Sequence, residues 1–228
     1  MRVLVVAAHP DDEVLGVGGT LARHAAEGDA VEVLICAQGL ASRPGGASAD
    51  ALEALREAAR GAARALGARA PRFLDLPDNA MDSVPLLDVV RRVEAVVAEV
   101  RPDVVYTHHA SDLNVDHRLA CQAVLTACRP LPGATVGAIY AFETPSSTEW
   151  AVPGAAAPFA PSHFVDISAT LEQKVRALGA YAAELRPFPH PRSVEALRHL
   201  AAWRGATVGC AAAEAFVPLR TLWPVGIP

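Results

Sequence analysis

Lysine, membrane-length apolar runs and paired cysteines are scarce or missing in this chain of 228 residues. Lys174 is its one lysine beside 19 arginines, and the formal net charge is −5, with no basic block or stripe. Proteins that bind nucleic acid usually carry such a stripe, so we expect no nucleic-acid partner. No uninterrupted apolar stretch approaches the roughly 20 residues of a membrane helix, so we expect no membrane span. These absences favour a small-molecule partner.

The four cysteines indicate neither an oxidised framework nor a C-x-x-C metal pair. Cys121 and Cys128 fall on one expected helix at a separation of about 10 Å, which a disulfide cannot span. The acidic residues at 11–13 interrupt the N-terminus before the apolar core of a secretory signal could form. We therefore expect a cytoplasmic protein.

Short apolar segments alternate with segments of helical spacing over residues 2–167. The expected strands are 2–8, 31–36, 73–76, 103–108, 136–142 and 163–167, and the expected helices are 14–27, 50–67, 86–100 and 117–128. Gly28 and Gly67 follow two of these helices as stop signals. The alternation predicts an α/β fold with a Rossmann-like, mostly parallel sheet flanked by helices on both faces.

Residues after about 143 are proline-rich and predict an irregular C-terminal extension over the site, interrupted by a helix expected at 169–186. The Gly/Ser/Pro-rich segment 39–50 is expected to form a mobile flap over a site. Because there is no repeat and no clear linker, we expect residues 1–228 to form a single domain.

Four ionisable residues follow directly on the first expected strand, namely His9, Asp11, Asp12 and Glu13. A second polar cluster, YTHHASDLNVDHR at 106–118, follows the strand at 103–108. Open α/β sheets bind ligands beyond the carboxyl ends of their strands, and neighbouring strands would bring two such clusters within about 5–10 Å. The sequence thus predicts one site built from both clusters.

These residue types suit a hydrolytic metal ion. Catalytic zinc usually takes three ligands from His, Asp and Glu and keeps one position for water. His9 and Asp12 from one turn and His117 from the second cluster supply such a set, which leaves Asp11 as general base. Two histidines favour Zn²⁺, or Fe²⁺ as the alternative, over the carboxylate-rich sites of magnesium enzymes.

Structural roles compete with some of these assignments. Asp11 or Glu13 at the start of the following helix would stabilise its positive N-terminus. Asp116 either caps the helix that His117 opens or orients the His117 ring through a hydrogen bond. Trp150 either stacks on a sugar ring or serves as a partly buried core aromatic.

The segment AHPDDEVLGVGGTLARHAAEGDAVEVL at 8–34 resembles the opening signature of the PIG-L/LmbE-like family of metal-dependent N-acetylglucosaminyl deacetylases. Asp116-His117-Arg118 matches the end of the family's downstream motif, and LREAARGAARALGA at 55–68 resembles its arginine-containing helix. The resemblance implies His9, Asp12 and His117 as zinc ligands, Asp11 as general base, and Arg56 as a substrate contact, although an ordinary surface role also suits Arg56. Family members often form multimers, so a homo-oligomer is also expected.

Asn114 departs from the family pattern, because many members have histidine three residues before the last zinc ligand. Asparagine can donate a hydrogen bond to a developing oxyanion, but it cannot carry a proton. Asp11 is then the expected general acid, with His108 or His109 from the same loop as the alternative. The neighbouring His109 is assigned to catalysis and His108 to substrate binding, or both pack within the loop.

The C-terminal segment ELRPFPHPRS adds His190 and Arg192 as expected contacts for a phosphate or carboxylate of a larger substrate, with packing or an oligomer contact as the alternative. The predicted function is zinc-dependent removal of the N-acetyl group from an N-acetylglucosamine-type sugar or conjugate, which releases acetate and a free amine. The alternatives are a metal-dependent hydrolase of a non-sugar or antibiotic-type biosynthetic intermediate, a magnesium-dependent phosphohydrolase, and a non-catalytic sugar-binding protein.

Overall fold

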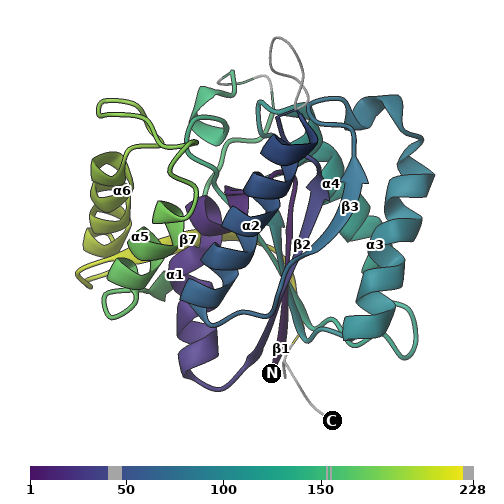
Figure 1. The fold of residues 1–228 in the computed structure, drawn as a ribbon. Helices are drawn as coiled ribbons and strands as arrows, with labels where there is room; N and C mark the ends of the chain where they lie inside the picture. Colours follow the sequence, from purple (N-terminus) through teal and green to yellow (C-terminus); the bar gives the residue numbers. More distant parts are fainter. Residues whose placement is uncertain (41–47, 153, 155, 223–228) are drawn as a thin grey trace.

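A computed structural model describes residues 1–40, 48–152, 154 and 156–222 of the chain. In this part of the chain, seven strands form one sheet in the order β3-β2-β1-β4-β5-β7-β6 (Figure 1). The strands are β1 (Arg2–Ala7), β2 (Ala30–Ala37), β3 (Arg72–Leu76), β4 (Val104–His108), β5 (Ala138–Phe142), β6 (His163–Asp166) and β7 (Ala213–Thr221). Strands β1 to β5 run parallel, and β7 runs antiparallel to its neighbours β5 and β6.

Helices cover both faces of the sheet. They are α1 (Asp12–Ala26), α2 (Ala49–Leu66), α3 (Leu86–Val100), α4 (Val115–Ala127), α5 (Leu171–Gly179) and α6 (Val194–Ala206), with short 3-10 helices η1 (Met81–Ser83) and η2 (Thr148–Trp150). On β1, Val3 and Val5 pack with α1, α2 and α5, whereas Leu4 and Val6 pack with α3 and α4. Burial on both faces explains why β1 is a continuous apolar run, and the predicted α/β fold is confirmed.

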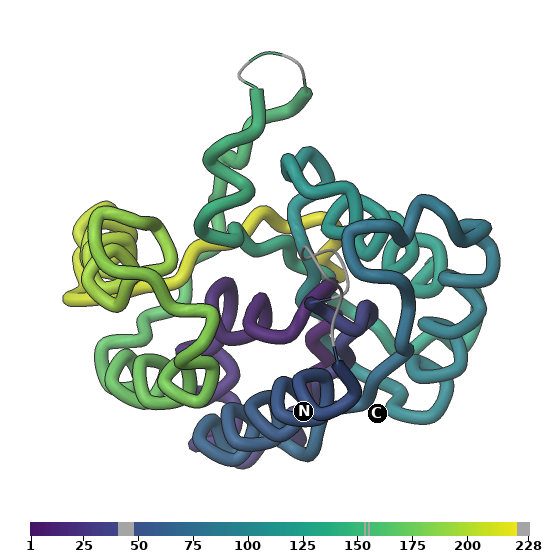
Figure 2. Tube along the Cα trace, turned by 45° about the horizontal axis from the view of Figure 1, so that its top comes forward, coloured from purple at the N-terminus to yellow at the C-terminus, as the bar shows by residue number. Residues whose placement is uncertain are grey.

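The region after residue 143 is more regular than its sequence predicts. The helix expected at 169–186 ends at Gly179, and neither α6 nor β7 was predicted. Figure 2 shows α6 at one edge of the molecule and α3 and α4 at the opposite edge. Strand β7 pairs with β5, which lies about 70 residues earlier, so its place depends on long-range pairing that local periodicity does not reveal.

The segment predicted as a flap, 39–50, lies largely outside the described residues, because these omit 41–47. Its last residues belong to α2, where the Ser48 hydroxyl caps the helix by accepting a hydrogen bond from the Ala51 amide at 3.1 Å. Ser48 therefore caps the helix that the sequence predicts at 50–67.

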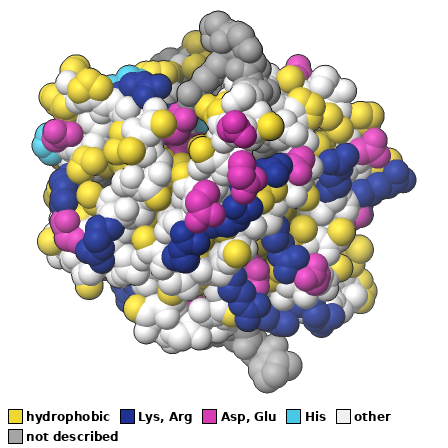
Figure 3. Space-filling model, in the orientation of Figure 1, with side chains coloured by type: hydrophobic (Ala, Val, Ile, Leu, Met, Phe, Trp, Pro, Cys, Tyr) yellow, Lys and Arg dark blue, Asp and Glu magenta, His cyan; other side chains and the backbone are white. Residues whose placement is uncertain are grey.

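Acidic and basic side chains interleave on the face of the molecule that α2 covers (Figure 3). On α2, Arg60 pairs with Glu53 and Glu57, and Arg64 also pairs with Glu57. These two arginines are thus paired with carboxylates on the same helix. None of the helices in the described residues has the length and apolar character needed to cross a bilayer.

Candidate metal centre

The two polar clusters meet at the carboxyl ends of β1 and β4. These strands pair in parallel, with Val5 beside Tyr106, and both end at the edge opposite the N-terminus in Figure 1. The Ala8 amide donates a hydrogen bond to Nε2 of His108 at 2.8 Å, which ties the first cluster to the second. The sheet order thus brings together residues that are about 100 positions apart in the chain.

The three predicted ligands form a nearly equilateral triangle. Nδ1 of His9 and Nε2 of His117 each lie 3.3 Å from Oδ2 of Asp12, and these two nitrogens lie 3.3 Å from each other. A tetrahedral zinc ion with bonds of about 2.0–2.1 Å holds its ligand atoms about 3.3 Å apart. The geometry of the three side chains therefore fits such an ion.

The electrostatics of the triangle also suit a cation. Asp12 is fully buried, and its Oδ1 atom has no hydrogen-bond partner among the described residues. Burial alone would lower the pKa of His9, but Asp116 and Asp12 outweigh it and raise that pKa to about 10. A site that stabilises positive charge on an imidazole will also stabilise a metal ion, and two histidines with one carboxylate suit Zn²⁺ or Fe²⁺.

A carboxylate fixes the second nitrogen of each ligand histidine. Nε2 of His9 lies 3.0 Å from Oδ2 of Asp116, and Nδ1 of His117 lies 3.1 Å from Oδ1 of Asp112. Protonation of these outer nitrogens directs the lone pairs of Nδ1 of His9 and Nε2 of His117 toward the triangle. Both histidines are thereby held in the tautomer that metal binding requires.

The sequence-based role of Asp116 is therefore corrected. Asp116 orients His9 rather than His117, because it opens α4 beside the first cluster and also accepts the Met81 amide at 2.9 Å. Asp112, which sequence reasoning missed, performs this role for His117. The other oxygen of Asp112 accepts a hydrogen bond from Thr148 at 2.6 Å. Burial would raise the pKa of Asp112, but His117, Ser147 and Thr148 outweigh that effect and lower the pKa to about 2. Asp112 lies within the second polar cluster, and that position was the signal by which the sequence could have identified it.

His108 packs against the ring of His117, one of the three triangle residues. Its ring is fully buried and stacks on the His117 ring, with centroids 3.9 Å apart and planes 19° apart. Burial, followed by the nearby His117, lowers the pKa of His108 to about 3, so the ring is neutral. Since Nε2 accepts from Ala8 and Nδ1 faces the Thr144 hydroxyl at 3.1 Å, both nitrogens are occupied. This position does not suit the substrate-binding role that the sequence predicts for His108.

Asp11 lies beside the triangle in a left-handed backbone conformation, with φ of 105°. Its side chain is almost fully buried, and its Oδ2 accepts a hydrogen bond from Nη1 of Arg192 at 3.0 Å. Burial raises the pKa of Asp11, and Arg192 opposes that shift. The Glu13 carboxylate, two residues after Asp11, accepts hydrogen bonds from the Tyr181 hydroxyl at 2.6 Å and from the Asp11 amide at 3.1 Å. Glu13 thus supports the turn that presents Asp11.

A small cavity of about 130 Å³ opens onto this edge of the sheet. Its lining includes His9, Asp11, Asn114 and Arg192, so four residues predicted for the site share one opening. Asn114 caps α4, because its Oδ1 accepts the Asp116 amide at 2.8 Å, and its side-chain nitrogen donates to Asn79 at 2.7 Å. The predicted oxyanion donor is therefore also a structural cap.

The remaining predicted residues lie further out. Arg56 pairs with Asp75 and lies over the Phe73 ring, 5.5 Å from its centroid. His109 lines a different cavity of about 290 Å³, where its Nε2 contacts the Ala157 carbonyl at 3.2 Å. None of the contacts described for these two side chains involves the triangle.

An aromatic side chain lies near His190. Trp150 is 51% exposed and presents its edge to His190, with ring centroids 6.2 Å apart. The ring is half-buried but belongs to none of the hydrophobic core clusters of the described residues, so the structure does not support a core role for Trp150. The Nδ1 atom of His190 accepts the Arg192 amide at 3.1 Å, so His190 shapes the turn that carries Arg192.

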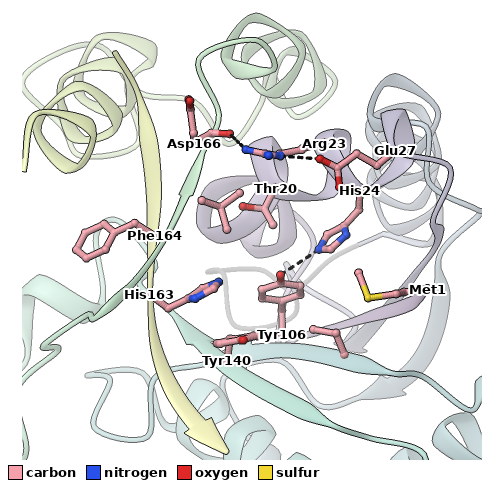
Figure 4. Close-up of a pocket in the computed structure, with 12 residues that line it drawn as sticks. Met1, Thr20, Arg23, His24, Glu27, Tyr106, Tyr140, His163, Phe164 and Asp166 are labelled. Atoms are coloured by element: carbon pink, nitrogen blue, oxygen red, sulfur yellow. Dashed lines mark hydrogen bonds and ion pairs between the residues drawn. The ribbon is translucent and has the colours of Figure 1, made fainter. Parts of the chain in front are cut away.

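A larger cavity of about 490 Å³ lies toward the opposite end of α1 (Figure 4). Thr20, Arg23 and His24 of α1 face it, and the ring of His24 bonds to the Tyr106 hydroxyl at 3.0 Å. The residues that line it include none of the predicted site residues. Size alone therefore does not mark the chemical site of this molecule.

Comparison with known proteins agrees with this geometry. A family model described as PIG-L, GlcNAc-PI de-N-acetylase, matches residues 4–128, which include both polar clusters. The 1D-myo-inositol 2-acetamido-2-deoxy-alpha-D-glucopyranoside deacetylase of Rhodococcus erythropolis (strain PR4) is 40% identical over 132 residues. That alignment covers 47% of this chain and 45% of the relative, so it spans less than half of the relative's length.

Longer matches extend the comparison beyond the family model. A relative of the same description from Mycobacterium sp. (strain JLS) is 30% identical over 236 residues, which cover 84% of this chain and 77% of that protein. The crystal structure of 4-carboxy-2-hydroxymuconate hydratase from Pseudomonas putida KT2440 is also similar, with a TM-score of 0.79 and 27% identity over 100% of this chain and 99% of that one. From these matches and from the two motifs at the strand ends, the chain belongs to the PIG-L family.

Proposed function

We propose that this chain is a zinc-dependent hydrolase that removes the N-acetyl group from an N-acetylglucosamine-type sugar or sugar conjugate. The observation that carries the proposal is the triangle of His9, Asp12 and His117 at 3.3 Å spacing, with Asp11 beside it in the same cavity. The description of the relatives in R. erythropolis and Mycobacterium supports an acetylated amino sugar as substrate. Acetate and a free amine would be the products.

The ligands in this proposal are His9, Asp12 and His117. A bound Zn²⁺ would polarise the amide carbonyl and lower the pKa of a coordinated water to about 7. Asp11 takes the proton from the attacking water, and burial helps because it raises the pKa of this carboxylate and so makes it a stronger base. Arg192 holds Asp11 in place through the 3.0 Å contact. Asp11 then returns the proton to the leaving nitrogen.

Asn114 is the proposed donor to the developing oxyanion. An amide group has two N–H bonds, and one of those of Asn114 donates to Asn79. The second is available to a substrate oxygen in the shared cavity, where a fixed donor stabilises negative charge in the transition state. Because Asn114 caps α4, its orientation is set before substrate binds.

Substrate recognition is proposed at the rim of the cavity. Arg192 is partly exposed, and its guanidinium suits a carboxylate or phosphate on a larger substrate. The exposed ring of Trp150 suits stacking on a sugar. We also infer that residues 1–228 form a single domain, because β7 near the C-terminus belongs to the same sheet as β1. The cytoplasmic location expected from the sequence remains a prediction. The homo-oligomer expected from the family remains a prediction.

Acetate release from a panel of N-acetylglucosamine compounds tests the proposal. The panel contains the free sugar and its inositol-linked, malate-linked and nucleotide-linked forms, each incubated with zinc-loaded protein. We expect release from at least one compound, and a fall of about 10²–10⁴-fold in Asp11→Asn, with zinc binding retained. Release that is unchanged in Asp11→Asn contradicts the role of Asp11. No release from the whole panel by zinc-loaded wild type contradicts the proposed activity.

A hydratase is the second candidate, favoured by the full-length match to the Pseudomonas hydratase. Addition of water to a carboxylated carbon–carbon double bond also needs a base for the water and a cation that binds the acid group, and Asp11 and Arg192 would supply them. Ultraviolet absorbance of a conjugated unsaturated carboxylate distinguishes the two candidates, because hydration removes the conjugation and releases no acetate.

A further inference from the structure

The one lysine of the chain is buried far from solvent. Lys174 lies on α5 and is 5% exposed, and its Nζ donates hydrogen bonds to Oε1 of Glu214 at 2.6 Å and to the Leu15 carbonyl at 2.8 Å. Glu214 lies on β7 and is equally buried. Burial of two charges carries a large desolvation penalty, and apolar residues of similar volume often serve stability as well. The pair therefore calls for a role besides stability.

Both side chains bond to main-chain groups in the interior of α1. The Glu214 carboxylate accepts the amides of Gly19 at 2.9 Å and Thr20 at 2.7 Å, while Lys174 takes the Leu15 carbonyl. In a regular α-helix the Gly19 amide would donate to that same carbonyl, four residues earlier. The ion pair thus bonds to both the amide and the carbonyl that a regular helix would join to each other.

The glycines of the segment VLGVGG permit this close approach. A Cβ atom on Gly18 would lie 3.3 Å from Cγ of Lys174, and one on Gly19 would lie 2.8 Å from Cδ1 of Ile167. Larger residues at these two positions would push α5 and Ile167, which directly follows β6, away from α1. The glycines that follow the HPDDE motif therefore allow Lys174 and Glu214 to reach the backbone of α1.

The anchored position is one helical turn from the metal triangle. The Leu15 amide donates to the Asp11 carbonyl at 2.9 Å, so Leu15 is held by Lys174 on one side and holds the strained Asp11 on the other. Asp12 follows immediately, whereas His117 comes from α4 on the other side of β1 and β4. Metal bonds tolerate errors of only about 0.2 Å, so α1 must be placed accurately against α4.

We propose that Lys174 and Glu214 are positioning residues, which anchor α1 so that Asp12 meets His9 and His117 in metal-binding geometry, with Asp11 beside them. This role rests on the proposed function, because it assumes that the triangle binds zinc. It also accounts for a lysine in a chain that otherwise uses arginine: the compact ammonium group of lysine fits between the Glu214 carboxylate and the Leu15 carbonyl, whereas a planar guanidinium needs more room.

Two variants and a matched control test the role. Lys174→Met/Glu214→Gln removes both charges together, so neither is left buried alone, and Glu214→Asp keeps the charge but withdraws it by one methylene group. Val93→Ala is the control, because it removes core volume from α3 on the opposite face of the sheet. For each purified protein we would measure the zinc dissociation constant by competition with a chromophoric chelator, the thermal midpoint, and amide hydrogen exchange in α1.

We expect both test variants to bind zinc about 10–100-fold more weakly, with faster exchange at Gly19 and Thr20, whereas Val93→Ala loses thermal stability but keeps its zinc affinity. If the double variant does not fold, Glu214→Asp decides the outcome. Wild-type zinc affinity in a folded test variant overturns the positioning role. Absence of zinc binding in the wild type contradicts the proposed function instead, so the two failures are distinguishable.

Discussion

Replacement of Asp112 by asparagine is expected to weaken zinc binding without disrupting the fold. Asp112 lies 3.1 Å from Nδ1 of His117, accepts the Asn114 amide at 2.9 Å and accepts hydrogen bonds from the hydroxyls of Ser147 and Thr148. An asparagine side chain has the same shape and can still accept from the ring and meet the hydroxyls, since a hydroxyl both donates and accepts. The substitution therefore removes mainly the negative charge that makes His117 a stronger ligand.

The expected loss can be bounded. Removal of a group that orients a metal-ligating histidine typically weakens metal affinity by about 10–100-fold, which corresponds to about 1.4–2.7 kcal/mol. Asp112→Asn belongs at the lower end, because a neutral acceptor remains, and Asp112→Ala belongs at the upper end. Competition with a chromophoric chelator at constant pH measures the zinc dissociation constant of each variant directly.

Asp88→Asn is the matched control, because it makes the same chemical change on α3 at a side chain that is 49% exposed. Its zinc affinity should equal that of wild type, and His117→Ala should lose tight binding. If Asp112→Asn binds zinc as tightly as wild type while His117→Ala does not, then the Asp112 carboxylate does not tune His117, and the reasoning from the 3.1 Å contact is refuted.

Three further predictions concern the rest of the molecule. Gly16→Ala should destabilise the fold by about 1–3 kcal/mol in urea denaturation, because the added Cβ would lie 2.2 Å from the Phe142 ring. Gly61→Ala in α2 should instead stabilise the fold by about 0.5–1 kcal/mol, and equal effects of the two substitutions would contradict the packing argument. An amine-acylating reagent should modify the native protein only at its α-amino group and reach Lys174 only after unfolding, as mass spectrometry of peptides can show. The partly exposed thiol of Cys210 should react rapidly with DTNB at pH 8, whereas the other three thiols should react only in denaturant. Burial raises the pKa of these three thiols, to about 12 for Cys36 and Cys121 and to about 11 for Cys128. Since unfolded thiols ionise near pH 8.5, the folded state holds more protons above that pH, and these thiols should lower the free energy of unfolding as the pH rises from about 8.5 toward 12.

The sequence by itself determined the parts of this protein that depend on neighbours in the chain. The continuous apolar run of β1, the turn with His9, Asp11 and Asp12, and the helical start that carries His117 could all be read locally, because strand and helix periodicity and the ligand preferences of metals are local properties. The mostly parallel sheet with helices on both faces then followed from the general rules for α/β folds, whereas the order of its strands came from the structure.

Only the tertiary structure decided which side chain supports which. Asp116 serves His9 and Asp112 serves His117, although Asp116 is adjacent to His117 in sequence, because adjacent residues of a helix point in different directions. The burial of His108, the contact of Arg192 with Asp11 and the pairing of Lys174 with Glu214 join segments separated by up to about 180 residues. Such contacts depend on how the sheet and helices pack, and no pattern of neighbouring residues encodes them.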